Sequence, residues 1–239
     1  MIAQPDRSVN ATLLLVSASP RRRELIKLLG LPVESTSADI DEVPLPGERA
    51  AEMAVRLSRA KALAVRPFRV STGALRSPQS AFTIILASDT VVSLNGEPLG
   101  KPRAAAEARS MLQRLRGRVH QVYTAITLID LQTDRSITEL AGSDVHMRNY
   151  TDEEIETYIA SDDPFDKAGA YAIQHTGFHP VENFAHCFAN VMGLPLCHVT
   201  RALRQWGVAV PNDVPALCQA YIRYACPVFE KILDQHIPL

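Results

Sequence analysis

The sequence predicts an α/β fold from three observations. Apolar runs at residues 11–16 and 83–87 are short enough to be buried strands, and stretches with helical spacing follow them. Two longer runs, 119–130 and 136–146, have the pattern of a strand hairpin on the same sheet. Hydrophobic residues make up 46% and charged residues 21% of the 239 residues, as in soluble globular proteins with a sizeable core.

Local signals along the chain predict each element. Residues 1–10 are predicted to be a flexible end. The strand at 11–16 leads through a tight turn into a helix that starts at Pro20 and stops before Gly30, residues typical of those positions. Residues 32–42 are expected to be extended, and 67–80 to form an exposed loop. Helical spacing or caps predict further helices over 48–65, 104–115, 151–161 and up to Trp206.

The remaining strands are less regular. Ser88-Asp-Thr90 is expected to terminate the strand at 83–87, and 91–94 resumes a strand pattern before the Asn95-Gly96 turn. A charged loop at 162–169 is expected to feed a strand at 170–174. Beyond Gly207 the sequence predicts a linker and one amphipathic helix over 217–232.

The turn Ser17-Ala-Ser-Pro-Arg-Arg-Arg-Glu-Leu25 contains a conflict of charge. Its three arginines fall in the first turn of the predicted helix, where the positive end of the helix dipole repels them. A phosphate chain would remove the conflict, because free N–H groups, the Ser17 and Ser19 hydroxyls and guanidinium groups together bind anions. Successive helical residues point about 100° apart, so at most two of the arginines can face one ligand. A solvated basic turn is the alternative.

Two acidic positions are candidates for chemistry. Asp39-Ile-Asp-Glu42 lies close in sequence to the basic turn and would hold a divalent cation against phosphates, unless it is a surface loop. Asp89 follows an apolar strand, and open α/β folds bind ligands beyond the carboxyl ends of strands. Asp89 is therefore a candidate base or metal ligand, with the capping of a turn as the alternative.

Composition excludes several classes of protein. A net charge of −1 does not favour a nucleic-acid partner, and no apolar run approaches the roughly 20 residues that span a bilayer, so we expect a cytoplasmic protein. The four cysteines lack a C-x-x-C pair, which favours reduced, mostly buried thiols. The spacing of His175 and His179 does not favour a zinc site, because the residues between them indicate a loop.

Seven motifs in one order resemble those of the Maf family of nucleoside triphosphate pyrophosphatases. The resemblance covers about residues 12–206. The motifs are Ser-Ala-Ser-Pro-Arg-Arg-Arg-Glu-Leu, Asp-Ile-Asp-Glu, Arg-Leu-Ser-Arg-Ala-Lys-Ala, Ala-Ser-Asp-Thr-Val-Val, Gly-Lys-Pro, Asp-Lys-Ala-Gly-Ala-Tyr-Ala-Ile-Gln and Asn-Val-Met-Gly-Leu-Pro. Such a resemblance implies the Maf or ITPase-like architecture, an elongated mixed sheet flanked by helices, with two lobes around a central cleft. It also implies hydrolysis of a nucleoside triphosphate to the monophosphate and pyrophosphate with a divalent cation, Mg²⁺ or Mn²⁺.

The resemblance assigns roles to individual residues. Asp89 matches the family's proton acceptor and, with Glu42, is expected to hold the metal. Lys61 and Lys101 match charged cleft residues, which we expect to bind the phosphates together with Ser17 and Ser19. The remaining matches are Arg22, Thr90 and Gln174, the triad linked to substrate choice in the subgroup that acts on dTTP and UTP. Arg22 is also expected to contact the triphosphate, and the Gln174 amide to read the O4/N3 edge of uracil or thymine.

Alternatives to this subgroup remain open at this stage. Enzymes of the 7-methyl-GTP type carry Trp in the first motif and an acidic residue at the glutamine position, and this chain has neither. Modified pyrimidine nucleotides are possible substrates, and a non-catalytic nucleotide-binding regulator of septum formation is the alternative outside enzymes. His175 and Ala185 stand where glycine is usual in the family, which would restrict the backbone near the base pocket.

The predicted domain organisation has three parts. After the flexible end at 1–10, residues 11–206 form the Maf-like domain and 207–239 a C-terminal helical extension. Exposed apolar residues in that extension would support a homodimer.

Overall fold

The computed structural model describes residues 11–72 and 82–235, and these form a mixed α/β structure around one sheet. Within them the sheet has seven strands in the order β2-β1-β3-β5-β6-β7, with β4 paired to β3 outside that path. The strands are β1 (Ala11–Val16), β2 (Val33–Thr36), β3 (Phe82–Leu94), β4 (Glu97–Leu99), β5 (Val119–Asp130), β6 (Ser136–Met147) and β7 (Val181–Glu182). The elongated mixed sheet that was predicted is confirmed.

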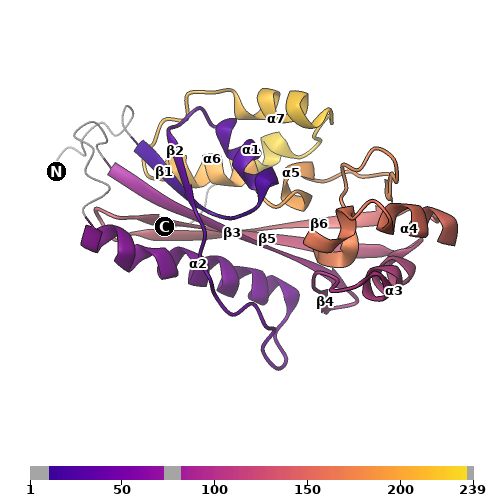
Figure 1. The fold of residues 1–239 in the computed structure, drawn as a ribbon. Helices are drawn as coiled ribbons and strands as arrows, with labels where there is room; N and C mark the ends of the chain where they lie inside the picture. The colour runs from indigo at the N-terminus through magenta and orange to yellow at the C-terminus, as the bar shows by residue number, and fades with distance from the viewer. Residues whose placement is uncertain (1–10, 73–81, 236–239) are drawn as a thin grey trace.

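Helices cover both faces of this sheet. Figure 1 shows α2 on one face, α1, α6 and α7 on the other, and α3 and α4 at one end of the long strands. The helices are α1 (Pro20–Lys27), α2 (Ala50–Thr72), α3 (Ala105–Leu115), α4 (Asp152–Ile159), α5 (Phe188–Val191), α6 (Leu196–Gln205), α7 (Val214–Ile222) and α8 (Phe229–Asp234), with short 3₁₀ helices η1 (Asp163–Asp166) and η2 (Ala168–Ala170). In the part of the chain described, no helix is both long and apolar enough to cross a bilayer.

The alternation of side chains along β1 and β3 explains how both faces are covered. Leu13 and Leu15 pack in one cluster with residues of α1 and α6, whereas Leu14 and Val16 pack with residues of α2. Successive strand residues point to opposite faces, so two strands supply two cores. A third apolar cluster joins Val92 and Leu94 of β3 and Val122 of β5 to residues of α3 and α4. This cluster is the core of the second lobe.

β3 is longer than the sequence predicts. Ser88-Asp-Thr90 does not terminate it, because pairing with β5 continues without interruption from Ile84 to Ser93. On its other edge β3 pairs with β1 only as far as Ala87, and with β4 only from Val92. Among the described strands this leaves residues 88–91 without a strand partner on that edge. Asp89 therefore lies in mid-strand, just beyond the carboxyl end of β1.

Three other expectations are wrong. Residues 170–174 are not a strand, because Gly169 and Ala170 have φ values of +72° and +61° and a turn follows. The alanine-rich α2 continues to Thr72, so the loop does not begin at residue 67. The helix expected over 217–232 is two helices, α7 and α8, separated at Arg223, which has φ +58°. Residues 1–10 and 73–80 of the predicted flexible segments lie outside the described residues.

The other local signals are confirmed. Thr151 and Glu154 form the capping box of α4, and β5 and β6 form the hairpin. Beyond Gly207 the chain returns to the main body, where Asn212 donates to the Leu28 carbonyl oxygen. All four cysteines are free thiols, with Cys187 and Cys197 buried.

Candidate active site

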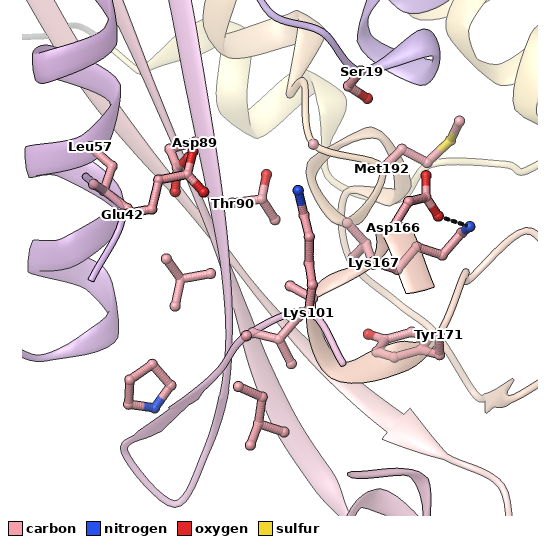
Figure 2. A pocket seen from close by; sticks show the side chains of 18 of the residues that line it. Ser19, Glu42, Leu57, Asp89, Thr90, Lys101, Asp166, Lys167, Tyr171 and Met192 are labelled. Atoms are coloured by element: carbon pink, nitrogen blue, oxygen red, sulfur yellow. Dashed lines mark hydrogen bonds and ion pairs between the residues drawn. The ribbon is translucent and has the colours of Figure 1, made fainter. Parts of the chain in front are cut away.

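A cleft of about 490 Å³ opens beside the unpaired edge of β3. Because Asp89 and Thr90 are neighbours in a strand, their side chains leave β3 on opposite sides. Asp89 points toward α2, and Thr90 points toward α1 and the segment that follows α5, yet both line the same cleft (Figure 2). The cleft therefore straddles the edge of the strand and has chemically different walls.

On the α2 side of the cleft, two carboxylates form ion pairs with the same lysine ammonium group. Lys61 Nζ lies 2.5 Å from Asp89 Oδ1 and 2.6 Å from Glu42 Oε1. Lys61 comes from α2, Asp89 from β3, and Glu42 from the extended segment after β2. An ammonium group has three N–H donors, so one remains for a ligand.

The two carboxylates differ in acidity because they differ in burial. Burial raises the pKa of Asp89 above its ordinary value, although Lys61 and Arg22 oppose this. Burial would also raise the pKa of Glu42, but that group is half exposed, and Lys61, Lys101 and Arg22 hold its pKa below the ordinary value. Asp89 is therefore the better proton acceptor of the pair.

The start of α1 forms the opposite wall. Ser19 is the N-cap residue, and its side chain makes no capping hydrogen bond. Arg21 lines the cleft and forms an ion pair with Asp166, at 3.3 Å. Arg23 turns away and donates to the Ser17 carbonyl oxygen at 3.3 Å. As predicted from helical geometry, no more than two of the three arginines face the cleft.

Arg22 lines the cleft, and three of its five N–H groups donate to protein acceptors. Its buried guanidinium donates to the carbonyl oxygens of Gly193 and Ser88 at 2.7 and 2.8 Å, and to Thr90 Oγ1 at 2.8 Å. The Ser88 carbonyl belongs to the unpaired stretch of β3, so the arginine satisfies an edge that lacks a strand partner. Arg22 thus holds α1, β3 and the Gly193 segment together at the floor of the cleft.

The third wall carries further charged groups. Figure 2 shows Lys101 extending into the cleft between the Asp89 side and the Asp166–Lys167 pair. Lys101 has no hydrogen bond or ion pair to another described residue, so its charge is available to a ligand. Lys167, in contrast, is held by Asp163 and Asp166 at 2.9 and 2.5 Å.

The structure brings together every predicted site residue except one. The residues lining the cleft include Ser19, Arg22, Glu42, Lys61, Asp89, Thr90, Lys101 and Gln174. Ser17 is buried and does not line it; its hydroxyl oxygen accepts from the Ser19 N–H at 3.1 Å. Sequence reasoning left Asp166, Lys167 and Gly193 without a role, although all three lie in motifs that it singled out.

The two residues found in place of family glycines leave the backbone unstrained. Neither His175 nor Ala185 has a positive φ, so neither position requires glycine. The His175 ring packs against Tyr158 with 4.7 Å between ring centroids, and its Nδ1 accepts from the Phe178 N–H at 2.9 Å. The restriction that the sequence suggested is therefore accommodated locally.

These features define an α/β protein whose cleft places cations and a helix start opposite a buried carboxylate. Comparison with known proteins places the chain within one family. The family model described as Maf-like protein matches residues 12–206. The chain belongs to the Maf family.

Several curated relatives carry one name. The dTTP/UTP pyrophosphatase of Geotalea uraniireducens (strain Rf4) is 40% identical over 197 residues, covering 82% of this chain and 96% of the relative. The dTTP/UTP pyrophosphatase of Thermomicrobium roseum is 43% identical over 214 residues, covering 87% and 92%. That of Chromobacterium violaceum is 42% identical over 197 residues, covering 82% and 96%.

Proposed function

We propose that the protein hydrolyses dTTP and UTP to the nucleoside monophosphate and pyrophosphate. The observation that carries the proposal is the placement of Asp89, a buried carboxylate of raised pKa, in one cleft with Lys101, Lys61 and the start of α1. The names of the relatives point to the same substrates.

Asp89 accepts the proton of the attacking water. The water oxygen forms a bond to the α-phosphorus, the bond to the bridging oxygen breaks, and pyrophosphate leaves with that oxygen. Because its pKa is raised by burial, Asp89 is a more effective base than an ordinary aspartate. Lys101 and the free N–H of Lys61 bind the phosphates and offset the charge that develops on the leaving group.

The start of α1 binds the rest of the triphosphate. Its unpaired backbone N–H groups and the Ser19 hydroxyl donate to phosphate oxygens, and the helix dipole favours their charge. Arg21 adds a guanidinium group, which pairs with the half-exposed Asp166. At the floor of the cleft, Arg22 holds the walls in position through its hydrogen bonds to Gly193 and Ser88.

The carboxylate pair fits a divalent cation. Glu42 and Asp89 offer hard oxygen ligands and converge on one point, where Lys61 now binds both. Among the residues described, no third His, Cys, Asp or Glu joins them, so phosphate oxygens and water would complete the coordination. Mg²⁺ or Mn²⁺ there would neutralise phosphate charge and lower the pKa of bound water.

Gln174 selects the base. It lies in the same cleft, at the end of the turn that follows Ala170. Its amide offers one donor group and one acceptor group, which match the O4/N3 edge of thymine and uracil. Gln174→Glu should weaken use of dTTP and UTP relative to purine nucleotides, and unchanged ratios would remove Gln174 from the base pocket.

Pyrophosphate release from a panel of nucleoside triphosphates, with and without Mg²⁺ or Mn²⁺, tests the function. The panel contains the common ribo- and deoxyribonucleotides, modified pyrimidine nucleotides and 7-methyl-GTP. We expect dTTP and UTP to be the preferred substrates. Binding of nucleotides without turnover would contradict the proposal and favour a regulatory protein.

A further inference from the structure

The segment that carries Glu42 has no secondary structure of its own. Residues 37–49 connect β2 to α2 and lie in neither a helix nor a strand. Figure 1 shows this segment crossing α2 and looping beyond the start of that helix. Val43 and Leu45 are 64% and 53% exposed, so apolar packing does not hold the part of the segment beyond Glu42. Polar contacts must fix it instead.

Arg56 supplies such contacts from the second turn of α2. Its Nε and Nη2 donate to Glu48 Oε1 and Oε2 at 2.6 and 2.8 Å. Nη2 also donates to the Val43 carbonyl oxygen at 3.1 Å. Two parallel hydrogen bonds between a guanidinium and a carboxylate fix the orientation of the two groups as well as their distance. One side chain therefore ties both ends of the stretch 43–48 to the helix.

Glu48 is a well-held partner for Arg56. Its side chain is only 8% exposed, so solvent screens this ion pair less than an ordinary surface pair. Glu48 Oε2 also accepts from the Leu45 N–H at 3.1 Å, and the Glu48 N–H donates to the Leu45 carbonyl oxygen at 3.0 Å. The hydrogen bonds from Arg56 hold the pKa of Glu48 below its ordinary value, which keeps the carboxylate charged at neutral pH.

The bond to Val43 places this anchor directly beside a candidate metal ligand. Glu42 meets Lys61 at 2.6 Å, but its side chain is 51% exposed. Arg56 fixes the backbone one residue further on, and Arg56 itself is not part of the lining of the cleft. Val43 and Pro44 do line the cleft. Arg56 therefore reaches the site only through the segment that it holds.

We propose that Arg56 is a positioning residue that holds Glu42 where it can coordinate the divalent cation of the reaction. This inference rests on the proposed function. Groups that orient a metal ligand without touching the metal typically change metal affinity or activity by about 10–100-fold when they are removed. Without Arg56, the stretch 43–48 loses its attachment to α2, and the Glu42 carboxylate is no longer aimed at Asp89.

The test measures binding of Mn²⁺ to the protein in the presence of α,β-methylene-dTTP, which cannot be cleaved at the α–β bond. The relaxation rate of water protons reports Mn²⁺ bound to the slowly tumbling protein. We expect Arg56→Gln to weaken Mn²⁺ binding at least about tenfold. Arg56→Lys keeps the charge but not the planar fork, so it should recover only part of the affinity.

Two further measurements use turnover and the other partner of the pair. The Mg²⁺ concentration that gives half-maximal pyrophosphate release from dTTP should rise by the same factor in Arg56→Gln, with little change in kcat at saturating Mg²⁺. Glu48→Gln breaks the pair from the other side and should weaken Mn²⁺ binding in the same direction. Full Mn²⁺ affinity in a folded Arg56→Gln or Glu48→Gln protein would overturn the inference.

Arg49→Gln is the matched control. Arg49 also pairs with a glutamate of α2, Glu52, at 2.5 Å, but that pair does not reach the Val43 backbone. The loss of this pair should leave Mn²⁺ affinity unchanged. An equal loss of affinity in Arg49→Gln would mean that any positive charge near the start of α2 has the effect, and the assignment to Arg56 would be wrong.

A double-mutant cycle asks whether Arg56 acts through Glu42. In a Glu42→Gln protein, Arg56→Gln should have little further effect on Mn²⁺ binding, because the ligand that it positions is already gone. A full additional loss would show that Arg56 acts through Val43 or Pro44, and the inference would be wrong. A wild type that binds Mn²⁺ and the analogue but releases no pyrophosphate from any nucleotide would overturn the proposed function instead.

Discussion

Replacing Gly193 with alanine places a methyl group against the most tightly held part of the cleft floor. Gly193 has φ +101°, and a Cβ there would lie 3.0 Å from Arg22 Nε and 3.1 Å from Thr90 Oγ1. The Gly193 carbonyl oxygen accepts from Arg22 Nε and from Ser88 Oγ at 2.7 and 2.8 Å. The methyl group therefore cannot displace a loose side-chain end; it displaces a guanidinium that three acceptors hold.

Two costs add up at this position. An alanine in the left-handed region costs about 1–2 kcal/mol. The loss of one hydrogen bond from a charged donor costs about 1.5–3 kcal/mol more. We expect Gly193→Ala to lower the free energy of unfolding by about 2.5–5 kcal/mol. Gly207→Ala is the matched control, because Gly207 also has a positive φ, +74°, but no atom within 4 Å of its Cβ position. That variant should lose only about 1–2 kcal/mol.

Equilibrium urea unfolding of both variants, followed by circular dichroism, gives the difference directly. Pyrophosphate release from dTTP should show kcat/KM at least about tenfold lower in Gly193→Ala, since one lost hydrogen bond in the floor misplaces Thr90, and near wild type in Gly207→Ala. Equal destabilisation by the two substitutions, or full activity of Gly193→Ala, would refute the role given to the Arg22 contacts.

Three further predictions follow from the carboxylate pair. Asp89→Asn should lower kcat for dTTP by about 10²–10⁴-fold with little change in KM, measured by pyrophosphate release; a wild-type kcat would remove Asp89 from the role of base. Because burial raises the pKa of Asp89, its contribution to stability is complete below the ordinary value of 3.8 and is lost as the pH rises through the raised value. The Tm of Asp89→Asn relative to wild type should therefore increase with pH above 3.8, and a constant difference would contradict the burial argument. Chelation with EDTA should abolish pyrophosphate release, and Mg²⁺ or Mn²⁺ should restore it; an unchanged rate in EDTA would exclude the metal.

Local sequence signals predicted most elements but not how far they extend. The strand at β1, the capping box of α4 and the β5–β6 hairpin depend on neighbours in sequence, and they were confirmed. The length of β3 depends on β5, a partner far along the chain, so the polar Ser88-Asp-Thr90 wrongly suggested an end. A strand was likewise expected at 170–174, whereas the backbone at Gly169 and Ala170 turns the chain away.

For the candidate site, the sequence likewise predicted the residues but not their contacts. Motif order was enough to name residues that the fold then gathers in one cleft, but not to say what each contacts. Lys61 is undistinguished in sequence, yet it joins Glu42 to Asp89. Arg22 lines the cleft as expected, and it also donates to Ser88 and Gly193, 66 and 171 residues away. No local pattern carries information about contacts of that range.

The central claim is that a water activated by Asp89 attacks the α-phosphorus of the bound nucleotide. Hydrolysis of dTTP in ¹⁸O-labelled water, followed by mass spectrometry of both products, tests it most directly. The account predicts one ¹⁸O atom in each dTMP and none in the pyrophosphate. Label in the pyrophosphate, or release of inorganic phosphate and dTDP, would contradict it.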